Sequence, residues 1–298
     1  MSAEARTPAP EAPRAPTDKK LFTGYKSTWC PGCGDFGVLE AAKRAYAELG
    51  YGPDDVVMVA GIGCSGRIGA YFKCYALHVT HGRTLPVATA VRMADPERPV
   101  LVAGGDGDAY AIGLGHFLHA VRRNIDVTYM VMDNEVYGLT LGQKSPTAQL
   151  GLVTKTSPEG VVEHPVRPLP LALITGATFV AQAFSGEVKQ LAEILKAAAR
   201  HKGFALVNIL SPCVTYNKVH SYDWARPRVR PIPEGEWESA DFDRAMKLAM
   251  EFPETIHTGV LYQTRRPIFE ELKGPRKPVT TPDVFRPADI TPLLEELY

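Results

Sequence analysis

The sequence predicts an α/β fold in which a mostly parallel sheet carries helices on both faces. Short, continuous apolar runs end in glycine or polar residues, as is typical of strands buried on both faces. Longer segments between them carry apolar residues at helical spacing. The two kinds of segment alternate along the chain, which indicates parallel strands joined by crossover helices.

The apolar runs predict five strands. The first run, at residues 56–60, reads VVMVA and is followed by Gly61. Residues 99–103 read PVLVA and are followed by a Gly-Gly pair in the same way. The remaining strands are expected at residues 127–132, 178–181 and 205–210.

Helical spacing predicts the segments between the strands. Residues 36–49 place Leu39, Ala42 and Tyr46 on one face, with Asp35 in position to cap the first turn. Further helices are expected at residues 111–122, 187–200 and 241–251.

The composition excludes several classes of protein. The chain has 298 residues, with 33 basic and 33 acidic side chains, so its formal net charge is zero. Hydrophobic residues make up 45% and charged residues 22%, which is ordinary for a soluble globular protein and excludes disorder for most of the chain. A neutral balance argues against binding to nucleic acid or to an anionic membrane, because both need a basic excess.

The two ends of the chain differ in composition from the middle. Residues 1–20 are rich in Ala and Pro and lack the apolar core of a signal peptide, so we expect a disordered arm. The apolar segment at residues 169–184 is interrupted and too short to span a membrane. We therefore expect a cytoplasmic protein, with a main domain at residues 21–221. Residues 222–298 are expected to form a C-terminal extension, for which wrapping a partner subunit is one interpretation.

Four distinctive residues each follow a predicted strand. They are Cys64, Asp106, Asn134 and Cys213. In an open parallel sheet, ligands bind beyond the carboxyl ends of the strands. We therefore expect these four residues to meet at one edge of the sheet and to form a ligand site there.

The sequence GDGD at residues 105–108 has two interpretations. Gly and Asp dominate turns, so it can be read as a simple turn. It can also bind a diphosphate and Mg²⁺, because glycines let the backbone approach phosphate and the Asp106 carboxylate suits a hard cation. Asn134 and the main-chain carbonyl of Val136 would supply further oxygen ligands. GDG followed by a helix, a strand and Asn is the thiamine diphosphate binding motif, which favours the second interpretation.

The five cysteines suggest a metal site. An odd, unevenly spaced set matches a secreted disulfide framework poorly. Cys30 and Cys33 form a C-x-x-C that would also suit a zinc knuckle or a redox dithiol. Together with Cys64 and Cys213 they make four thiolates, the number that a [4Fe–4S] cluster needs. Cys74 has apolar neighbours and is expected to be a buried core thiol.

Six runs, in order, resemble the β subunits of 2-oxoacid:ferredoxin oxidoreductases, and among them the members that act on 2-oxoglutarate. The resemblance covers residues 25–216, and its only departures are Ala90 and Leu141, where glycine is expected. The runs are WCPGCGDFG at 29–37, GIGCSGR at 61–67, HGRTLPVATA at 81–90, GGDGDAYAIG at 104–113, DNEVYGLTLGQKSPT at 133–147 and GATFVAQ at 176–182.

The resemblance implies a set of cofactor ligands. Cys30, Cys33, Cys64 and Cys213 would bind the [4Fe–4S] cluster. Asp106, Asn134 and the Val136 carbonyl would bind Mg²⁺. The thiamine diphosphate would be lined by Ile62, Gly63, Cys64, Ser65, Gly105, Gly107, Asp108, Gly138 and Leu139.

The resemblance also implies a reaction. Members of the family convert a 2-oxoacid and coenzyme A to acyl-CoA and CO₂, and pass two electrons singly through the cluster to ferredoxin. The expected substrate is 2-oxoglutarate, giving succinyl-CoA, with pyruvate or another 2-oxoacid as the alternative. The pyrimidine half of the cofactor site would come from an α subunit, so we expect an αβ or α2β2 assembly and an isolated chain that is inactive.

Two residues are candidates for contact with the substrate. Arg67 lies three residues after Cys64 and either pairs with a surface carboxylate or binds the distal carboxylate of 2-oxoglutarate. His81 begins the HGR run and is the second candidate, although a structural role is its ordinary alternative. Residues 143–147 begin a loop that is expected to meet coenzyme A or the α subunit.

Two other functions compete with this interpretation. A non-oxidative thiamine-dependent decarboxylase of the acetolactate synthase kind would have no cluster and a chain nearly twice as long. A non-enzymatic zinc-knuckle or electron-transfer subunit would have lost Asp106 or Asn134, and both are present.

Overall fold

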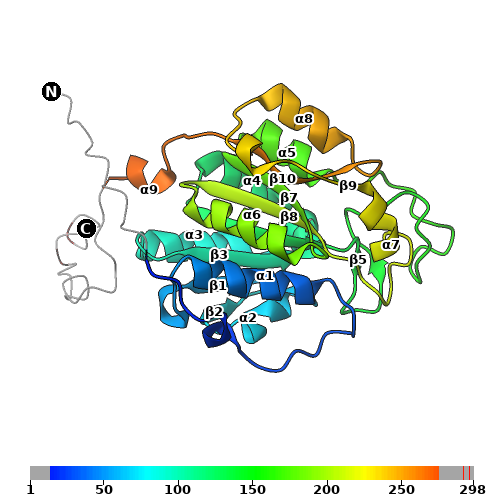
Figure 1. Ribbon diagram of the computed structural model, residues 1–298, viewed down its shortest axis with the longest axis horizontal. Helices are drawn as coiled ribbons and strands as arrows, with labels where there is room; N and C mark the ends of the chain where they lie inside the picture. The colour runs from blue at the N-terminus through cyan, green and yellow to red at the C-terminus, as the bar shows by residue number, and fades with distance from the viewer. Residues whose placement is uncertain (1–13, 275–290, 292–294, 296–298) are drawn as a thin grey trace.

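An eight-stranded sheet forms the centre of the computed structural model, which describes residues 14–274, 291 and 295 (Figure 1). The first six strands in spatial order are mutually parallel: β2 (Tyr75–His78), β1 (Val57–Ala60), β3 (Val100–Gly105), β4 (Val127–Asp133), β8 (Phe204–Leu210) and β7 (Phe179–Phe184). β10 (Ile256–Gln263) then pairs antiparallel with β7, and β9 (Val229–Pro231) pairs parallel with β10. The predicted α/β fold with a mostly parallel sheet is confirmed.

Helices cover both faces of the sheet. α1 (Asp35–Glu48) and α6 (Val188–Arg200) pack against each other on the face that Figure 1 shows in front. The other face carries α3 (Thr84–Ala94), α4 (Leu114–Arg123) and α5 (Pro168–Thr175), and α8 (Phe242–Met250) packs on α5. Shorter elements are α2 (Ile68–Tyr71), β5 (Val136–Tyr137), β6 (Gln143–Lys144), α7 (Tyr222–Ala225) and α9 (Phe269–Leu272).

All five predicted strands are present, and α1, α6 and α8 lie where helical spacing predicts them. Two of the differences lie close to the expected site. Asp35 was expected to cap α1, but Gly34 is the N-cap and Asp35 is the first helical residue. The helix expected from residue 111 begins at Leu114, because a π-helical turn, η4 (Gly107–Ile112), precedes it.

The sequence did not predict β2, α3 or α5, and it predicted an irregular C-terminal tail where β10 in fact extends the sheet. All four residues of β2 are exposed at the edge of the sheet, so the strand lacks the continuous apolar run of its neighbours. α5 starts with Pro168 and Pro170, which are compatible with a first helical turn but suggest a loop in the sequence.

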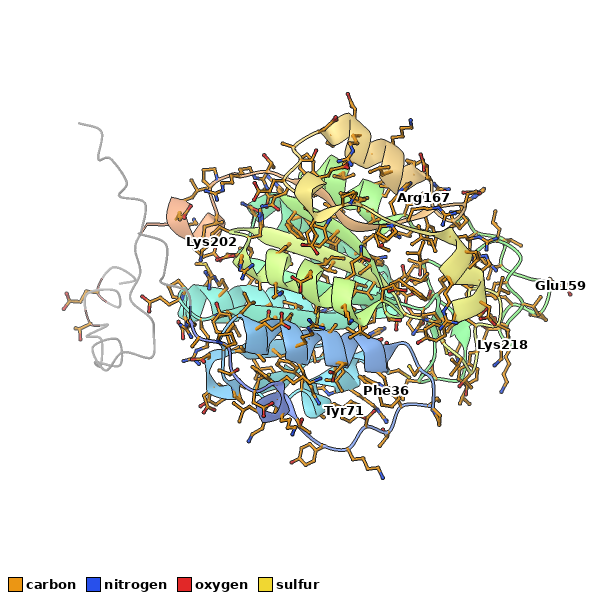
Figure 2. The ribbon with its side chains drawn as sticks, viewed as in Figure 1. Phe36, Tyr71, Glu159, Arg167, Lys202 and Lys218 are labelled. Carbon is orange, nitrogen blue, oxygen red and sulfur yellow. The ribbon has the colours of Figure 1, made fainter. Side chains whose placement is uncertain are left out.

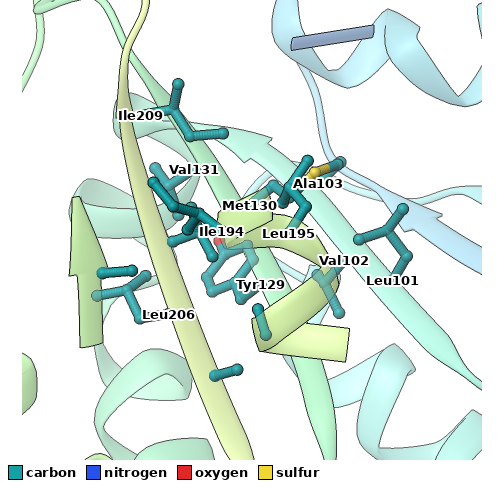
Figure 3. Packing of buried hydrophobic residues seen from close by; sticks show 14 of the residues in the cluster. Leu101, Val102, Ala103, Tyr129, Met130, Val131, Ile194, Leu195, Leu206 and Ile209 are labelled. Atoms are coloured by element: carbon teal, nitrogen blue, oxygen red, sulfur yellow. The ribbon is translucent and has the colours of Figure 1, made fainter. Parts of the chain in front are cut away.

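The core lies between the sheet and its helices. Every residue of β4 and of β8 is buried. Figure 3 shows Leu101, Tyr129 and Leu206 from the sheet with Ile194 and Leu195 from α6. Each such side chain contributes on the order of 1.5–3 kcal/mol by leaving water, so the central strands form a stable platform for the loops at their carboxyl ends.

Residues 222–274 are joined to the main sheet. β10 extends it beside β7, and α9 is anchored through the buried Arg92, which pairs with Asp126 and with Glu270. The expected extension beyond residue 274 lies almost entirely outside the described residues, and the division of the chain at residue 221 stays a prediction.

The expected N-terminal arm is described only in part, because residues 1–13 lie outside the described residues. Thr17, within that expected arm, hydrogen-bonds to the carbonyl groups of Ala47 and Tyr51. Within the described part of the chain, no helix has the length and apolarity needed to cross a membrane.

Candidate functional site

The four segments that follow β1, β3, β4 and β8 meet at one edge of the sheet. The Ser211 amide donates to the carbonyl of Asp133 (2.8 Å), so the segment leading to Cys213 continues beside the end of β4. A methyl group added to Gly138 would lie 3.4 Å from the sulfur of Cys64 and 3.9 Å from that of Cys213. The structure therefore brings these segments together at one edge of the sheet.

Asp106 is a buried carboxylate at this edge, with only 1% of its surface exposed. Burial raises the pKa of Asp106 to about 6, and hydroxyl groups of Ser145 and Thr147 oppose this rise. The nearby Glu135 adds to the rise. A buried carboxylate in this environment gains much from a bound cation, which neutralises its charge.

Thr147 joins Asp106 to a second buried acid. Its hydroxyl oxygen lies 2.7 Å from Asp106 Oδ2 and 2.8 Å from Asp133 Oδ1. One hydroxyl has one proton, so it can donate to only one of them, and the other contact needs a protonated carboxyl. Burial, and then the charges of Asp106 and Glu135, raise the pKa of Asp133 well above its usual range.

The turn after β4 presents Asn134 and Val136. Glu135 has a left-handed backbone (φ 63°), and the Asn134 side-chain oxygen accepts from the Val136 amide (3.1 Å). His220 Nδ1 lies 2.7 Å from the Glu135 carboxylate, and Asn217 donates to Asn134 O (3.1 Å). The segment after Cys213 therefore holds the turn that carries the two expected magnesium ligands.

The oxygen groups at this edge fit a Mg²⁺ ion held with a diphosphate. Asp106 offers a carboxylate, Asn134 a side-chain carbonyl and Val136 a main-chain carbonyl, and Mg²⁺ favours few protein oxygens together with substrate phosphates. Among the described residues, no three or more histidine, cysteine or acidic side chains form an ion site by themselves. A single acidic ligand completed by phosphate oxygens is compatible with that finding.

Asp108 fixes the two loops beside the site. Its Oδ1 accepts hydrogen bonds from the Ile62 amide (3.1 Å), the Gly82 amide (2.8 Å) and His81 Nδ1 (2.8 Å). A Cβ atom at Gly61 would lie 2.2 Å from Asp108 Oδ2, so only glycine fits there. Asp108 thus sets the path of the backbone around the expected cofactor pocket.

His81 is oriented by this contact. With Nδ1 against Asp108, its Nε2 makes no hydrogen bond to the described residues, and a third of the side chain is exposed. Its ring lies 6.0 Å, centroid to centroid, from Tyr137, whose hydroxyl donates to Gly107 O. Nε2 is thus available to a ligand at the edge that carries Asp106.

Arg67 lies beside the cysteine segments. Its guanidinium donates to the Thr28 hydroxyl (2.7 Å), which also contacts the Tyr71 hydroxyl (2.8 Å). Within residues 14–274 the guanidinium forms no ion pair, and both interpretations of Arg67 stay predictions. The Thr28 and Tyr71 hydroxyl groups are thus polar neighbours of the guanidinium.

The four candidate cluster ligands are all free thiols. Burial raises the pKa of Cys64 to about 11, and the charges of Asp35 and Cys213 add to the rise. The pKa of Cys33 is also raised well above its usual range, by burial first and then by Asp35, with Cys213 and Cys64 adding smaller rises. Such thiols lose their protons when a metal binds, which is the chemistry that an iron–sulfur cluster requires, but among the described residues no three of them form a group that would hold a single ion.

Trp29 connects the C-x-x-C to the Cys64 segment. Its indole nitrogen donates to the Cys64 carbonyl (2.7 Å). Phe36 and Tyr71, both labelled in Figure 2, pack edge-on against the indole ring, with centroids at 5.4 and 4.8 Å. This aromatic group holds the N-terminal cysteine segment against the body of the protein.

Cys74 is the fifth thiol and packs against the hydrophobic core. Burial raises the pKa of Cys74 to about 12, and no other cysteine affects it. This supports the expectation that Cys74 is a core thiol.

Several residues of the site were not expected from sequence. Their side chains are buried, and hydrogen bonds link them to one another or to residues that were expected. They are Asp35, Asp133, Glu135, Thr147, Ser211, Asn217 and His220. Thr147 ends the loop segment 143–147 that was expected to contact a ligand or partner, and Asn217 and His220 follow Cys213 closely, so proximity in sequence was the available signal.

The edge also exposes apolar side chains. Ile62 is 39% exposed, Leu139 42% and Leu141 56%. Leu141 also has a left-handed backbone (φ 80°), a conformation that favours glycine. Exposed apolar groups beside a polar site are typical of surfaces that a ligand or another protein covers.

Family models match most of the chain. A model described as the C-terminal TPP binding domain of thiamine pyrophosphate enzymes matches residues 61–209. A second, described as the C-terminal part of the pyruvate ferredoxin oxidoreductase beta subunit, matches residues 213–276.

Curated relatives and solved structures are similar over most of their length. The beta subunit of a 2-oxoacid:ferredoxin oxidoreductase from Saccharolobus solfataricus is 43% identical, over 79% of this chain and 81% of the relative. The 2-oxoglutarate oxidoreductase subunit KorB of Mycobacterium tuberculosis is 43% identical, over 74% of this chain and 61% of the relative. A structure of 2-oxoglutarate:ferredoxin oxidoreductase from Magnetococcus marinus, with 2-oxoglutarate, coenzyme A and succinyl-CoA bound, matches with a TM-score of 0.85 and 41% identity. That match covers 95% of this chain and 96% of the other.

Proposed function

The chain belongs to the β subunits of the 2-oxoacid:ferredoxin oxidoreductases, and from this premise we propose that it oxidises 2-oxoglutarate together with an α subunit. The proposed products are succinyl-CoA and CO₂, with the electrons passed through a [4Fe–4S] cluster to ferredoxin.

One observation carries the proposal. Two of the expected cluster thiols, Cys64 and Cys213, flank Gly138 at the edge of the sheet where the expected magnesium ligands Asp106 and Asn134 follow β3 and β4. A non-oxidative thiamine enzyme has no need of the thiols, and an electron-transfer subunit has no need of Asp106 or Asn134. An enzyme that releases electrons from the substrate at thiamine diphosphate and removes them through a cluster uses both sets of ligands.

The residues of this chain have separate tasks in the proposal. Asp106, Asn134 and the Val136 carbonyl hold Mg²⁺, and the cysteines at positions 30, 33, 64 and 213 hold the cluster. When bound, thiamine diphosphate supplies an electron sink for decarboxylation, and the cluster accepts electrons one at a time. Asp108 keeps the two neighbouring loops in place.

Arg67 and His81 are proposed to contact the substrate. The guanidinium of Arg67 is anchored by Thr28 and forms no ion pair within residues 14–274, so it is available to a carboxylate. His81 Nε2 can donate to, or accept from, a group at the same edge, because Asp108 fixes the ring through Nδ1.

The names of relatives support 2-oxoglutarate as the substrate. The proteins from Mycobacterium tuberculosis and Archaeoglobus fulgidus are both named for 2-oxoglutarate, and the Magnetococcus marinus structure contains it. Pyruvate is the second candidate, because the family model that matches residues 213–276 is named for pyruvate.

An α subunit is part of the proposal. The relatives are named as beta subunits, and Ile62, Leu139 and Leu141 expose apolar surface beside the site. The α subunit would cover that surface and complete the pocket for the pyrimidine ring, in an αβ or α2β2 assembly. The chain alone is therefore expected to be inactive.

The test is to purify this chain anaerobically with the α subunit encoded beside its gene. The complex should be brown and should reduce ferredoxin with 2-oxoglutarate, but only when coenzyme A is present. Pyruvate should be a poorer substrate by kcat/KM, and this chain without the α subunit should reduce no ferredoxin. A colourless, zinc-loaded complex, or turnover without ferredoxin reduction, would contradict the proposal.

A further inference from the structure

Asp35 is a buried carboxylate that touches the cysteine-bearing segments from inside the protein. It is 1% exposed and follows Cys33 by two residues. The hydroxyl of Ser211, two residues before Cys213, donates to Asp35 Oδ1 at 2.7 Å. The Ser65 hydroxyl, next to Cys64, also lies near enough to lower the pKa of Asp35 by hydrogen bonding, against the larger rise from burial.

The backbone around Asp35 is packed just as closely. The Gly34 amide donates to the Pro212 carbonyl at 3.2 Å, which joins the start of α1 to the segment after β8. A Cβ atom at Gly34 would lie 2.5 Å from the Ser211 hydroxyl and 2.8 Å from the Pro212 nitrogen. The Asp35–Ser211 contact therefore lies in a tightly packed junction.

Asp35 has no other local task that would explain its burial. It does not cap α1, because the N-cap is Gly34 and no side chain caps that end. Its Oδ2 is buried and makes no hydrogen bond that meets normal geometry. Burying a carboxylate with so few partners costs free energy, so a purely structural role would be met better by an apolar residue.

We propose that Asp35 is the positioning residue of the cluster site: its carboxylate holds the segment that leads to Cys213 against the start of α1, which follows Cys33. This rests on the proposed function, since the thiols must hold a cluster for their spacing to matter. Three segments from distant parts of the chain have to present their sulfur atoms to one group. A single buried acceptor bound by Ser211 and approached by Ser65 sets part of that arrangement before the cluster is present.

In this role Asp35 differs from the cysteines that bind the cluster. Asp35 gives no atom to the cluster, so its loss should weaken assembly and distort the cluster environment without abolishing binding. Asp35→Asn keeps an oxygen that can accept from Ser211, so it should retain more of the cluster than Asp35→Ala. Ser211→Ala removes the same bond from the other side.

The experiment uses the complete complex with the α subunit, purified and reconstituted anaerobically with iron and sulfide. Asp35→Ala should retain less than half of the wild-type iron and sulfide per chain, and Asp35→Asn more than half. The reduced cluster of Asp35→Asn should have altered EPR g-values. The exposed Asp243→Asn, in the first turn of α8, is the control and should match the wild type.

A double variant tests whether Asp35 and Ser211 act through one bond. The Asp35→Ala/Ser211→Ala protein should lose no more iron than Asp35→Ala alone, because the bond is already absent in the single variant. Fully additive losses would mean that the two residues act separately, which would overturn the proposal.

Further outcomes separate this inference from the proposed function. Wild-type iron content and EPR spectra in both Asp35 variants would overturn the inference and leave the function intact. If Asp35→Ala fails to fold or to bind the α subunit, normal spectra of both Asp35→Asn and Ser211→Ala would overturn it instead. A wild-type complex that takes up no iron would overturn both.

Discussion

Nδ1 of His81 lies 2.8 Å from Oδ1 of the buried Asp108. The same oxygen also accepts hydrogen bonds from the main-chain amides of Ile62 and Gly82. Asp108 comes directly after Gly107, and His81 precedes α3, so the pair joins segments 27 residues apart. The contact fixes the histidine ring and both flanking loops with one carboxylate. A histidine held in this way is better suited to contact a ligand than a freely rotating side chain.

Replacing Asp108 with alanine should weaken the binding of thiamine diphosphate. Three hydrogen bonds to the loops at Ile62 and His81 are lost, and each is worth about 0.5–1.5 kcal/mol, so we expect a roughly tenfold or larger rise in Kd. Titration calorimetry on the Mg²⁺-containing complex measures this. The exposed Asp223→Ala should leave the Kd unchanged, and an unchanged Kd in Asp108→Ala would show that the loops do not depend on this carboxylate.

Thr147→Val should raise the Mg²⁺ concentration needed for cofactor binding. Valine has the shape of threonine but leaves Asp106 and Asp133 without the shared hydroxyl, and a buried polar group without its partner costs about 1–3 kcal/mol. The half-saturating Mg²⁺ concentration should therefore rise about tenfold. Thr147→Ser keeps the hydroxyl and should remain within about threefold of the wild type. Equal behaviour of the two variants would exclude a positioning role for the Thr147 hydroxyl.

The expected cofactor ligands and the residues that support them differ in how far sequence can predict them. Asp106, Asn134 and Cys64 follow buried strands, and parallel strands bring their carboxyl ends to one edge, so their meeting follows from the fold. Ser211 and Thr147 are ordinary residues of loops. The local sequence does not indicate that Ser211 binds Asp35 or that Thr147 joins Asp106 to Asp133, because loop conformation depends on tertiary contacts.

The elements that were missed have a similar cause. β2 is exposed on an edge, α3 has Pro86 in its first turn, and α5 begins with two prolines, so their local signals are weak or contrary. Their formation depends on packing against the sheet, which a local pattern cannot express. β4 and β8, in contrast, are buried throughout and largely apolar, and sequence located both within one residue at their amino ends.

Single cysteine variants should separate ligands from the core thiol. Serine at position 30, 33, 64 or 213 removes one of the four thiolates, and we expect at least half of the bound iron to be lost after anaerobic purification. Cys74→Ser is the matched control, because Cys74 packs on the core and is expected to keep the full iron content. Iron and acid-labile sulfide analysis of each variant measures the bound cluster. Loss of iron in Cys74→Ser alone would mean that Cys74, and not the other four cysteines, binds the cluster.

His201 should make the protein less stable in mild acid. Burial lowers the pKa of His201 to about 4, and its Nε2 lies 2.8 Å from the Thr178 hydroxyl. The unfolded chain binds the proton near pH 6.5, so the free energy of unfolding falls as the pH drops from 6.5 towards 4. At pH 5, protonation of this histidine in the unfolded chain lowers the free energy of unfolding by about 2 kcal/mol relative to pH 7.5.

The measurement for His201 is a comparison of urea unfolding at pH 7.5 and pH 5. Buried acids with a raised pKa, such as Asp133, act in the opposite direction, so only the difference between proteins is informative. His201→Gln lacks the titrating group and should lose about 2 kcal/mol less than the wild type between the two pH values. The same pH dependence in both proteins would rule out His201 as its source.

Arg67→Ala tests the choice of substrate. The guanidinium is anchored by Thr28 and has no ion pair within residues 14–274, so a substrate carboxylate is a suitable partner. Hydrogen bonds to charged groups are worth about 1.5–3 kcal/mol, so kcat/KM for 2-oxoglutarate should fall about 10–100-fold. Pyruvate has no distal carboxylate, and its kcat/KM should change less than about threefold.

Thr28→Val removes the anchor of the guanidinium but keeps the guanidinium itself. Its kcat/KM on 2-oxoglutarate should lie between those of the wild type and Arg67→Ala. Equal losses on both substrates in Arg67→Ala would mean that Arg67 acts on a feature they share, and its role in selecting 2-oxoglutarate would have to be abandoned.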